Sequence, residues 1–210
     1  MLRDVDLDVE AGESVAITGP SGCGKSTLLL ALAGIIRPDQ GEIRIAGTNV
    51  RTADDDAICV MRRDAMGFVF QLGELIAELT LLENVAIPLE LKGVRRHEAR
   101  RRARSHMKEL GIEELGNRFP GEVSGGQSQR AAVARALMND PVVVLADEPT
   151  GALDGDNARR VLDQLLTMTA IRGTSLVMVT HDQNVAVAAD RQIHMADGCV
   201  RSDGLAAKCL

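Results

Sequence analysis

The sequence predicts an α/β fold built on a largely parallel sheet, and three observations support this. Short apolar, β-branched runs alternate with longer runs of helix formers along the 210 residues, as in βα units. The run VVVLAD at 142–147 is apolar until its last residue, which is typical of a strand covered on both faces. A glycine-rich loop joins a strand-like run to a helix-like run within residues 14–34. Together these patterns indicate repeated units of strand, loop and helix.

Each expected element has a local reason. SVAITG (14–19) is a β-branched run that ends in glycine and is predicted as a strand, whereas KSTLLLALAG (25–34) combines helix formers with a glycine stop. EIRIAG (42–47) alternates polar and apolar residues, as a half-buried strand does. Further strands are expected at GFVF (67–70), VVVLAD (142–147) and SLVMVT (175–180).

Strand-like patterns are absent between GFVF and VVVLAD, where the composition shifts to helix formers. The simplest account is a helical lobe inserted between two strands of the sheet. We therefore expect one domain over residues 1–210, with a sheet lobe at 1–71 and 140–210 and a helical lobe at 72–139.

Composition argues against several classes of protein. The chain has a net charge of −6, three Phe and no Trp or Tyr, which argues against a broadly basic DNA-binding surface and against a stacking platform for single-stranded nucleic acid. No apolar run approaches the ~18 residues that cross a bilayer, and the charged first ten residues do not resemble a secretory signal. The cysteines form no CxxC pair and are expected to be reduced thiols of a cytosolic protein: Cys23, Cys59, Cys199 and Cys209.

A cluster of arginines occupies residues 95–104. It could bind an anionic partner, but Glu98 and Glu109 lie in the same helical stretch. A solvated helix face is the favoured interpretation.

The glycine-rich loop GPSGCGKS matches the pattern GxxxxGK[ST] between a predicted strand and a predicted helix. Such a loop turns its backbone N–H groups inward to bind phosphate, and the helix N-terminus adds partial positive charge. Lys25 would reach the β- and γ-phosphates, and Ser26 would place its hydroxyl on Mg²⁺. The alternative is a glycine-rich turn without a ligand. The candidate nucleotide-binding residues here are Gly19, Pro20, Ser21, Gly22, Cys23, Gly24, Lys25, Ser26 and Thr27.

Two adjacent acids end the apolar run at 142–147. A nucleotide hydrolase needs a carboxylate to hold the metal's water shell and a group to activate the attacking water. Asp147 is the candidate for the first role and Glu148 for the general base. The alternative is a pair of solvated acids at a strand exit.

Further motifs resemble one family, the nucleotide-binding subunits of ABC transporters. VSGGQ (123–127) resembles the signature usually written LSGGQ, and it is joined, in the family's order, by FVFQ, ADEPTGALD and VTHD. The resemblance covers Leu2 to about Arg201. It implies an α/β P-loop NTPase fold, with a RecA-like sheet lobe and an inserted helical ABC signature lobe.

The resemblance also implies roles for individual residues. Gln71 would contact Mg²⁺ and the attacking water, so the implied metal-associated residues are Ser26, Gln71 and Asp147. His181 would hold the γ-phosphate and Glu148 in register. The signature residues Ser124, Gly125, Gly126 and Gln127 would bind ATP held by a second, identical subunit across a head-to-tail interface. Without the resemblance, Gln71 is an interfacial polar residue and His181 a structural one.

Residues 68–94 resemble the branch that serves lipoprotein release, macrolide export and antimicrobial-peptide export. The resemblance implies an ATPase with ATP and Mg²⁺ as cofactors and an integral membrane permease as partner, selected by residues 75–89. It implies a cytoplasmic location, peripheral on the inner face of the cell membrane through the permease, and no nucleic-acid partner. Two alternatives remain: a non-transport ABC ATPase acting on DNA or ribosomes, and a cassette fragment that binds nucleotide weakly and serves as an interaction module.

The sequence departs from the family at two points. Family members carry an N-terminal strand with an aromatic residue that stacks on adenine, and we expect that strand to be truncated here. Val123 replaces the usual leucine of the signature, a change that should leave anion binding intact.

Overall fold

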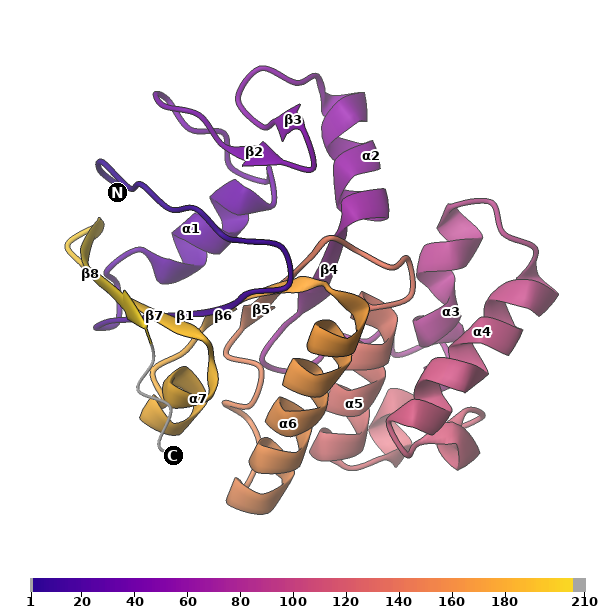
Figure 1. Cartoon of the computed structure of the whole chain (residues 1–210). Helices are drawn as coiled ribbons and strands as arrows, with labels where there is room; N and C mark the ends of the chain where they lie inside the picture. Colours follow the sequence, from indigo (N-terminus) through magenta and orange to yellow (C-terminus); the bar gives the residue numbers. More distant parts are fainter. Residues whose placement is uncertain (1, 206–210) are drawn as a thin grey trace.

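The computed structural model describes residues 2–205, so Cys209 lies outside the described part. Its centre is a six-stranded sheet in the order β4-β5-β6-β1-β7-β8 (Figure 1). The first five strands in that order are mutually parallel, and β8 runs antiparallel to β7. The strands are β1 (Ser14–Thr18), β4 (Met66–Val69), β5 (Val143–Asp147), β6 (Ser175–Val179), β7 (Arg191–Ala196) and β8 (Cys199–Leu205).

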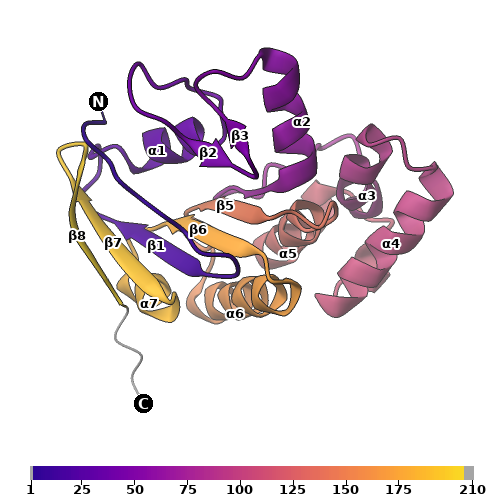
Figure 2. The same ribbon diagram turned by 45° about the horizontal axis from the view of Figure 1, so that its top comes forward.

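Helices cover both faces of the sheet, as Figure 2 shows. One face carries α1 (Lys25–Leu32) and α2 (Asp55–Ala65), and the other carries α6 (Gly155–Arg172) and α7 (Gln183–Ala188). Side chains alternate accordingly along β1, since Val15 and Ile17 join one buried cluster and Ala16 the other. This burial on both faces explains why the strands are nearly continuous apolar runs.

The segment between β4 and β5 is helical. It contains α3 (Leu81–Leu91), α4 (Arg96–Glu109) and α5 (Gly125–Ala136), with short 3₁₀ turns at Glu113–Leu115 and Pro120–Glu122. Figure 1 shows α3 and α4 beyond the β4 end of the sheet. Met107 and Leu137 are fully buried in the same apolar cluster as Val144 of β5. The helical segment and the sheet therefore share one core.

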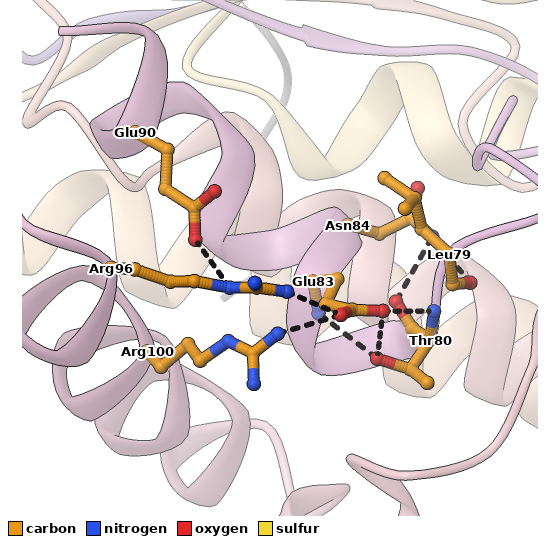
Figure 3. A network of polar contacts seen from close by, with 7 residues as sticks. All are labelled: Leu79, Thr80, Glu83, Asn84, Glu90, Arg96 and Arg100. Carbon is orange, nitrogen blue, oxygen red and sulfur yellow. Dashed lines mark hydrogen bonds and ion pairs between the residues drawn. The ribbon is translucent and has the colours of Figure 1, made fainter. Parts of the chain in front are cut away.

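A polar network joins the start of α3 to α4 (Figure 3). Thr80 and Glu83 form a reciprocal capping box, which supplies partners for helix-terminal amides. Glu83 also pairs with Arg96 at 3.0 Å and with Arg100 at 2.6 Å. Hydrogen bonds from the Thr80 backbone and hydroxyl, with a smaller contribution from Arg100, lower the pKa of Glu83. Part of the arginine cluster thus links two helices as well as facing solvent.

Several elements differ from the expectation. The strand expected at 42–47 is only β2 (Arg44–Ile45), which pairs with β3 (Thr48–Asn49) in a separate hairpin. Residues 46 and 47 turn with φ values of 49° and 81°. Helices α2, α6 and α7 and strands β7 and β8 were not individually predicted. Residues 2–10 form no strand, and no helix among the described residues is long and apolar enough to cross a membrane.

Candidate functional site

The carboxyl ends of β1, β5 and β6 meet at one edge of the sheet. Val179 of β6 lies opposite Ile17 on one side and Asp147 on the other. Because parallel strands end at the same edge, this register brings together the glycine-rich loop after β1, the acids after β5 and the residues after β6. Ligands of open α/β sheets bind at such an edge.

The glycine-rich loop wraps around the Lys25 side chain. The Lys25 ammonium donates to the carbonyl oxygens of Gly19 at 2.8 Å and Pro20 at 3.1 Å. Gly24 precedes α1 with φ 107°, a conformation that favours glycine. A Cβ on Gly19 would lie 2.1 Å from the carbonyl oxygen of Met195. The loop therefore requires glycine at both positions to place Lys25 at its centre.

Asp147 and Ser26 face each other across this edge. The Ser26 hydroxyl lies 3.5 Å from Asp147 Oδ1, which is a long hydrogen bond. Burial raises the pKa of the Asp147 carboxyl, and the neighbouring Glu148 adds to that shift, while Ser26 and Lys25 oppose it. An incoming cation would relieve this unfavourable burial of charge.

Glu148 is held by the residues that follow β6. Its Oε1 accepts from the His181 N–H at 3.1 Å and lies 2.6 Å from His181 Nδ1. Its Oε2 accepts from the Thr180 hydroxyl at 3.3 Å. The Glu148 side chain is 17% exposed and that of His181 70%. Glu148 has a φ of 46°, an uncommon value for a residue with a side chain.

Gln71 reaches the same place from the end of β4. A Cβ built on Gly151 would lie 3.1 Å from Gln71 Nε2 and 3.3 Å from Glu148 Cβ. Gln71 and Glu148 therefore flank Gly151, and a side chain at residue 151 would displace one of them. The structure brings together Lys25, Ser26, Gln71, Asp147, Glu148 and His181.

The signature residues cap and begin α5. Ser124 caps the helix by accepting from the Gln127 N–H at 3.3 Å, while Gln127 Oε1 accepts from the Ser124 N–H at 2.9 Å. The amides of Gly125 and Gly126 lie in the first turn, where a helix offers no acceptor. A Cβ on Gly126 would come within 3.1 Å of Asn157 in α6. The signature turn is therefore packed against the start of α6.

One residue of the site was missed. Gln129 of α5 is 2% exposed, and its Nε2 donates to the carbonyl oxygens of Phe70 and Pro149, both at 2.8 Å. These two residues adjoin Gln71 and Glu148 in the sequence. No pattern in the sequence shows which helix side chain meets these carbonyls.

A glycine-rich loop built around a lysine, facing paired acids at the end of β5, defines a P-loop nucleotide hydrolase. The chain belongs to the ABC transporter family, which it matches over residues 2–151. It is an ABC ATPase, and both the fold and the activity expected from the sequence are confirmed.

Relatives and solved structures support this assignment. A lipoprotein-releasing system ATP-binding protein LolD of Chromohalobacter salexigens is 44% identical over 97% of this chain and 86% of its own length. A macrolide export ATP-binding/permease protein MacB of Rhodopseudomonas palustris is 46% identical over 96% of this chain, which spans only 31% of that relative. The dimeric post-hydrolysis structure of an ATP-binding cassette with ADP and Pi has a TM-score of 0.89 and 40% identity, covering 99% and 91% of the two chains. These matches favour a transporter ATPase over one acting on DNA or ribosomes.

Proposed function

We propose that this chain powers an integral membrane permease that exports a lipoprotein, a peptide or a drug. The observation that carries the proposal is the grouping of Lys25, Asp147 and Glu148 at one sheet edge, together with a separate helix-capped signature turn. The names of the relatives, which concern lipoprotein release and macrolide export, support the export branch.

The chain would work as a single domain in two lobes, the sheet lobe at 1–71 and 140–210 and the helical lobe at 72–139. The residues present fit Mg²⁺, because Ser26, Asp147 and Gln71 offer the hard oxygen donors that this cation prefers. Burial of the Asp147 carboxylate fits a position beside a cation. When bound, Mg²⁺ would neutralise charge on the phosphates.

Hydrolysis needs an oriented base and a positively charged cradle. Glu148 would accept the proton of the attacking water, and its contacts with Thr180 and His181 fix the direction of the carboxylate. The Lys25 ammonium would stabilise charge developing on the γ-phosphate. Gln71 lies beside Glu148, where its amide would orient the same water.

The signature turn would act on a second copy of the chain. Ser124, Gly125 and Gly126 present helix N-terminal amides, which bind anions well. In the head-to-tail arrangement that the family resemblance implies, those amides would meet the γ-phosphate held by the opposite Lys25. The proposed active unit is therefore a homodimer with two ATP molecules at its interface.

A groove of about 510 Å³ between α2, β4, α3 and α5 is the proposed contact surface for the permease. Phe68, Phe70 and Pro88 line it, with Ile35 54% and Leu91 68% exposed. Exposed apolar side chains around a hollow are typical of protein contacts. Residues 75–89, expected to select the partner, run along this side through α3. Binding there would place the chain in the cytoplasm, peripheral on the inner face of the membrane.

The catalytic assignment is tested with Glu148→Gln. We expect phosphate release to fall by ~10²–10⁴-fold while ATP binding, measured by titration calorimetry, is retained. Glu109→Gln is the matched control, because Glu109 pairs with Arg172 at 2.8 Å outside this edge and should keep activity within about twofold. Near-normal turnover of Glu148→Gln would eliminate Glu148 as the base.

The permease surface is tested by photocrosslinking in membranes of the native cell. A photoreactive residue at position 91 should yield an adduct with an integral membrane protein. The same residue at position 171 is the control, since Ile171 is 76% exposed at the end of α6. Equal adducts from both positions, or none from position 91, would contradict the proposed groove.

A further inference from the structure

Gln129 is a residue of the signature helix α5, and its side chain bonds to the backbone next to the two groups proposed for catalysis. Its single amide nitrogen donates to the backbone carbonyls of both Phe70 and Pro149. Phe70 immediately precedes Gln71, and Pro149 immediately follows Glu148. One buried side chain of α5 is therefore bonded to the backbone beside each of these two residues.

The same helix holds the rest of the turn that carries Gln71. The Gly73 N–H donates to the Phe70 carbonyl at 3.0 Å and closes a turn around Gln71. Arg135, also in α5, donates to the carbonyls of Gly73 at 2.9 Å and Glu74 at 2.8 Å. Helix α5 thus fixes both ends of this turn.

We propose that Gln129 is a positioning residue that couples the placement of α5 to the distance between Gln71 and Glu148. The inference rests on the catalytic roles proposed above for those two residues. Because the two hydrogens of one amide serve both carbonyls, movement of α5 relative to β5 strains or breaks at least one of the two bonds. A shift of the signature helix is therefore transmitted to the base and to the residue that orients its water.

A shift of α5 should have a large effect on the rate of hydrolysis, because Gln71 and Glu148 are close neighbours around Gly151. A misplacement of about 1 Å in a catalytic group costs on the order of 10²-fold in rate. Gln129 bonds to the backbone beside Gln71 and Glu148 and not to their side chains. Its substitution should therefore lower turnover and leave the phosphate-binding loop intact. The expected signature is a fall in kcat with little change in KM.

Gln129→Met tests this, because methionine keeps the length of the side chain and removes both donors. We expect the kcat for ATP to fall at least tenfold, with KM changed less than threefold. Gln129→Glu, which removes the amide donors in the same shape, should also fall at least tenfold. Circular dichroism at the assay temperature establishes that each variant is folded.

The matched control is Gln164→Met, since Gln164 of α6 also donates its amide to a backbone carbonyl, that of Leu110, at 3.3 Å. It should retain kcat within twofold. A folded Gln129→Met enzyme with kcat within threefold of wild type, or an equal loss in Gln164→Met, would overturn the coupling role. If instead Glu148→Gln retains activity, the catalytic assignment fails first, so the two failures are distinguishable.

Discussion

Replacing Asn84 with alanine should destabilise the protein strongly, because Asn84 anchors the chain that leads into α3. Its side chain is fully buried. Its Oδ1 accepts from the Ile76 N–H at 2.7 Å, and its Nδ2 donates to the carbonyls of Ile76, Leu79 and Thr80 at 2.9 to 3.1 Å. Figure 3 shows this side chain beside Leu79 and Thr80.

The cost follows from which backbone groups lose their partner. The Thr80 carbonyl still accepts from the Asn84 N–H, and the Ile76 carbonyl still accepts from the Leu79 N–H. The Ile76 N–H and the Leu79 carbonyl lose the partner that Asn84 supplied. Each stranded polar group costs about 1–3 kcal/mol, and since Ile76 is 41% exposed, water reduces the cost there. We expect a loss of about 2–4 kcal/mol in the free energy of unfolding.

The measurement is urea denaturation followed by circular dichroism, which suits a chain without Trp or Tyr. Asn184→Ala is the control, because Asn184 is exposed in α7, and we expect it to change stability by no more than about 0.5 kcal/mol. A loss below about 0.5 kcal/mol in Asn84→Ala would refute the account of stranded backbone groups.

Three further predictions concern charge and assembly. Asp147→Asn should raise the melting temperature of the nucleotide-free protein at neutral pH, because burial raises the pKa of Asp147; the gain should shrink as the pH falls through that raised pKa. Burial and, to a smaller extent, the charge of Arg172 lower the pKa of His106 from its ordinary value of 6.5. The wild-type protein should therefore lose stability as the pH falls below 6.5, because the unfolded chain then binds the proton more readily than the folded one. His106→Gln, compared by thermal denaturation, should lose less. Glu148→Gln with ATP should dimerise in light scattering, and adding Ser124→Arg should prevent it; a monomer in the first case contradicts the dimer.

The central sheet could be predicted because burial on both faces gives β1, β5 and β6 continuous apolar runs. Strand β7 escaped prediction since its exposed His194 and half-buried Arg191 interrupt any such run. Helix α2 escaped because three successive aspartates, residues 54–56, resemble a loop, whereas Asp54 is its N-cap and accepts from the Ala57 N–H at 2.7 Å.

The site was predictable where chemistry follows directly from local sequence, as at Lys25 and Asp147. The contact between Glu148 and His181 depends on the register of β5 with β6, which joins residues 33 positions apart. Gln129 shows most clearly what local sequence patterns fail to predict about the site. Helical periodicity places it in α5, but only the tertiary packing shows that its amide meets two carbonyls from distant segments.

The left-handed backbone at Glu148 bears on how this protein can evolve. A φ of 46° disfavours most side chains, and glycine or asparagine adopts it at lower cost. Selection for stability alone would therefore drive position 148 away from glutamate, and only selection for turnover retains it. In a duplicated copy that is no longer selected for ATP hydrolysis, residue 148 should be among the first to change, toward glycine or asparagine, while the buried residues of the sheet are retained. Surveys that rank substitutions by thermal stability would favour the same inactivating changes.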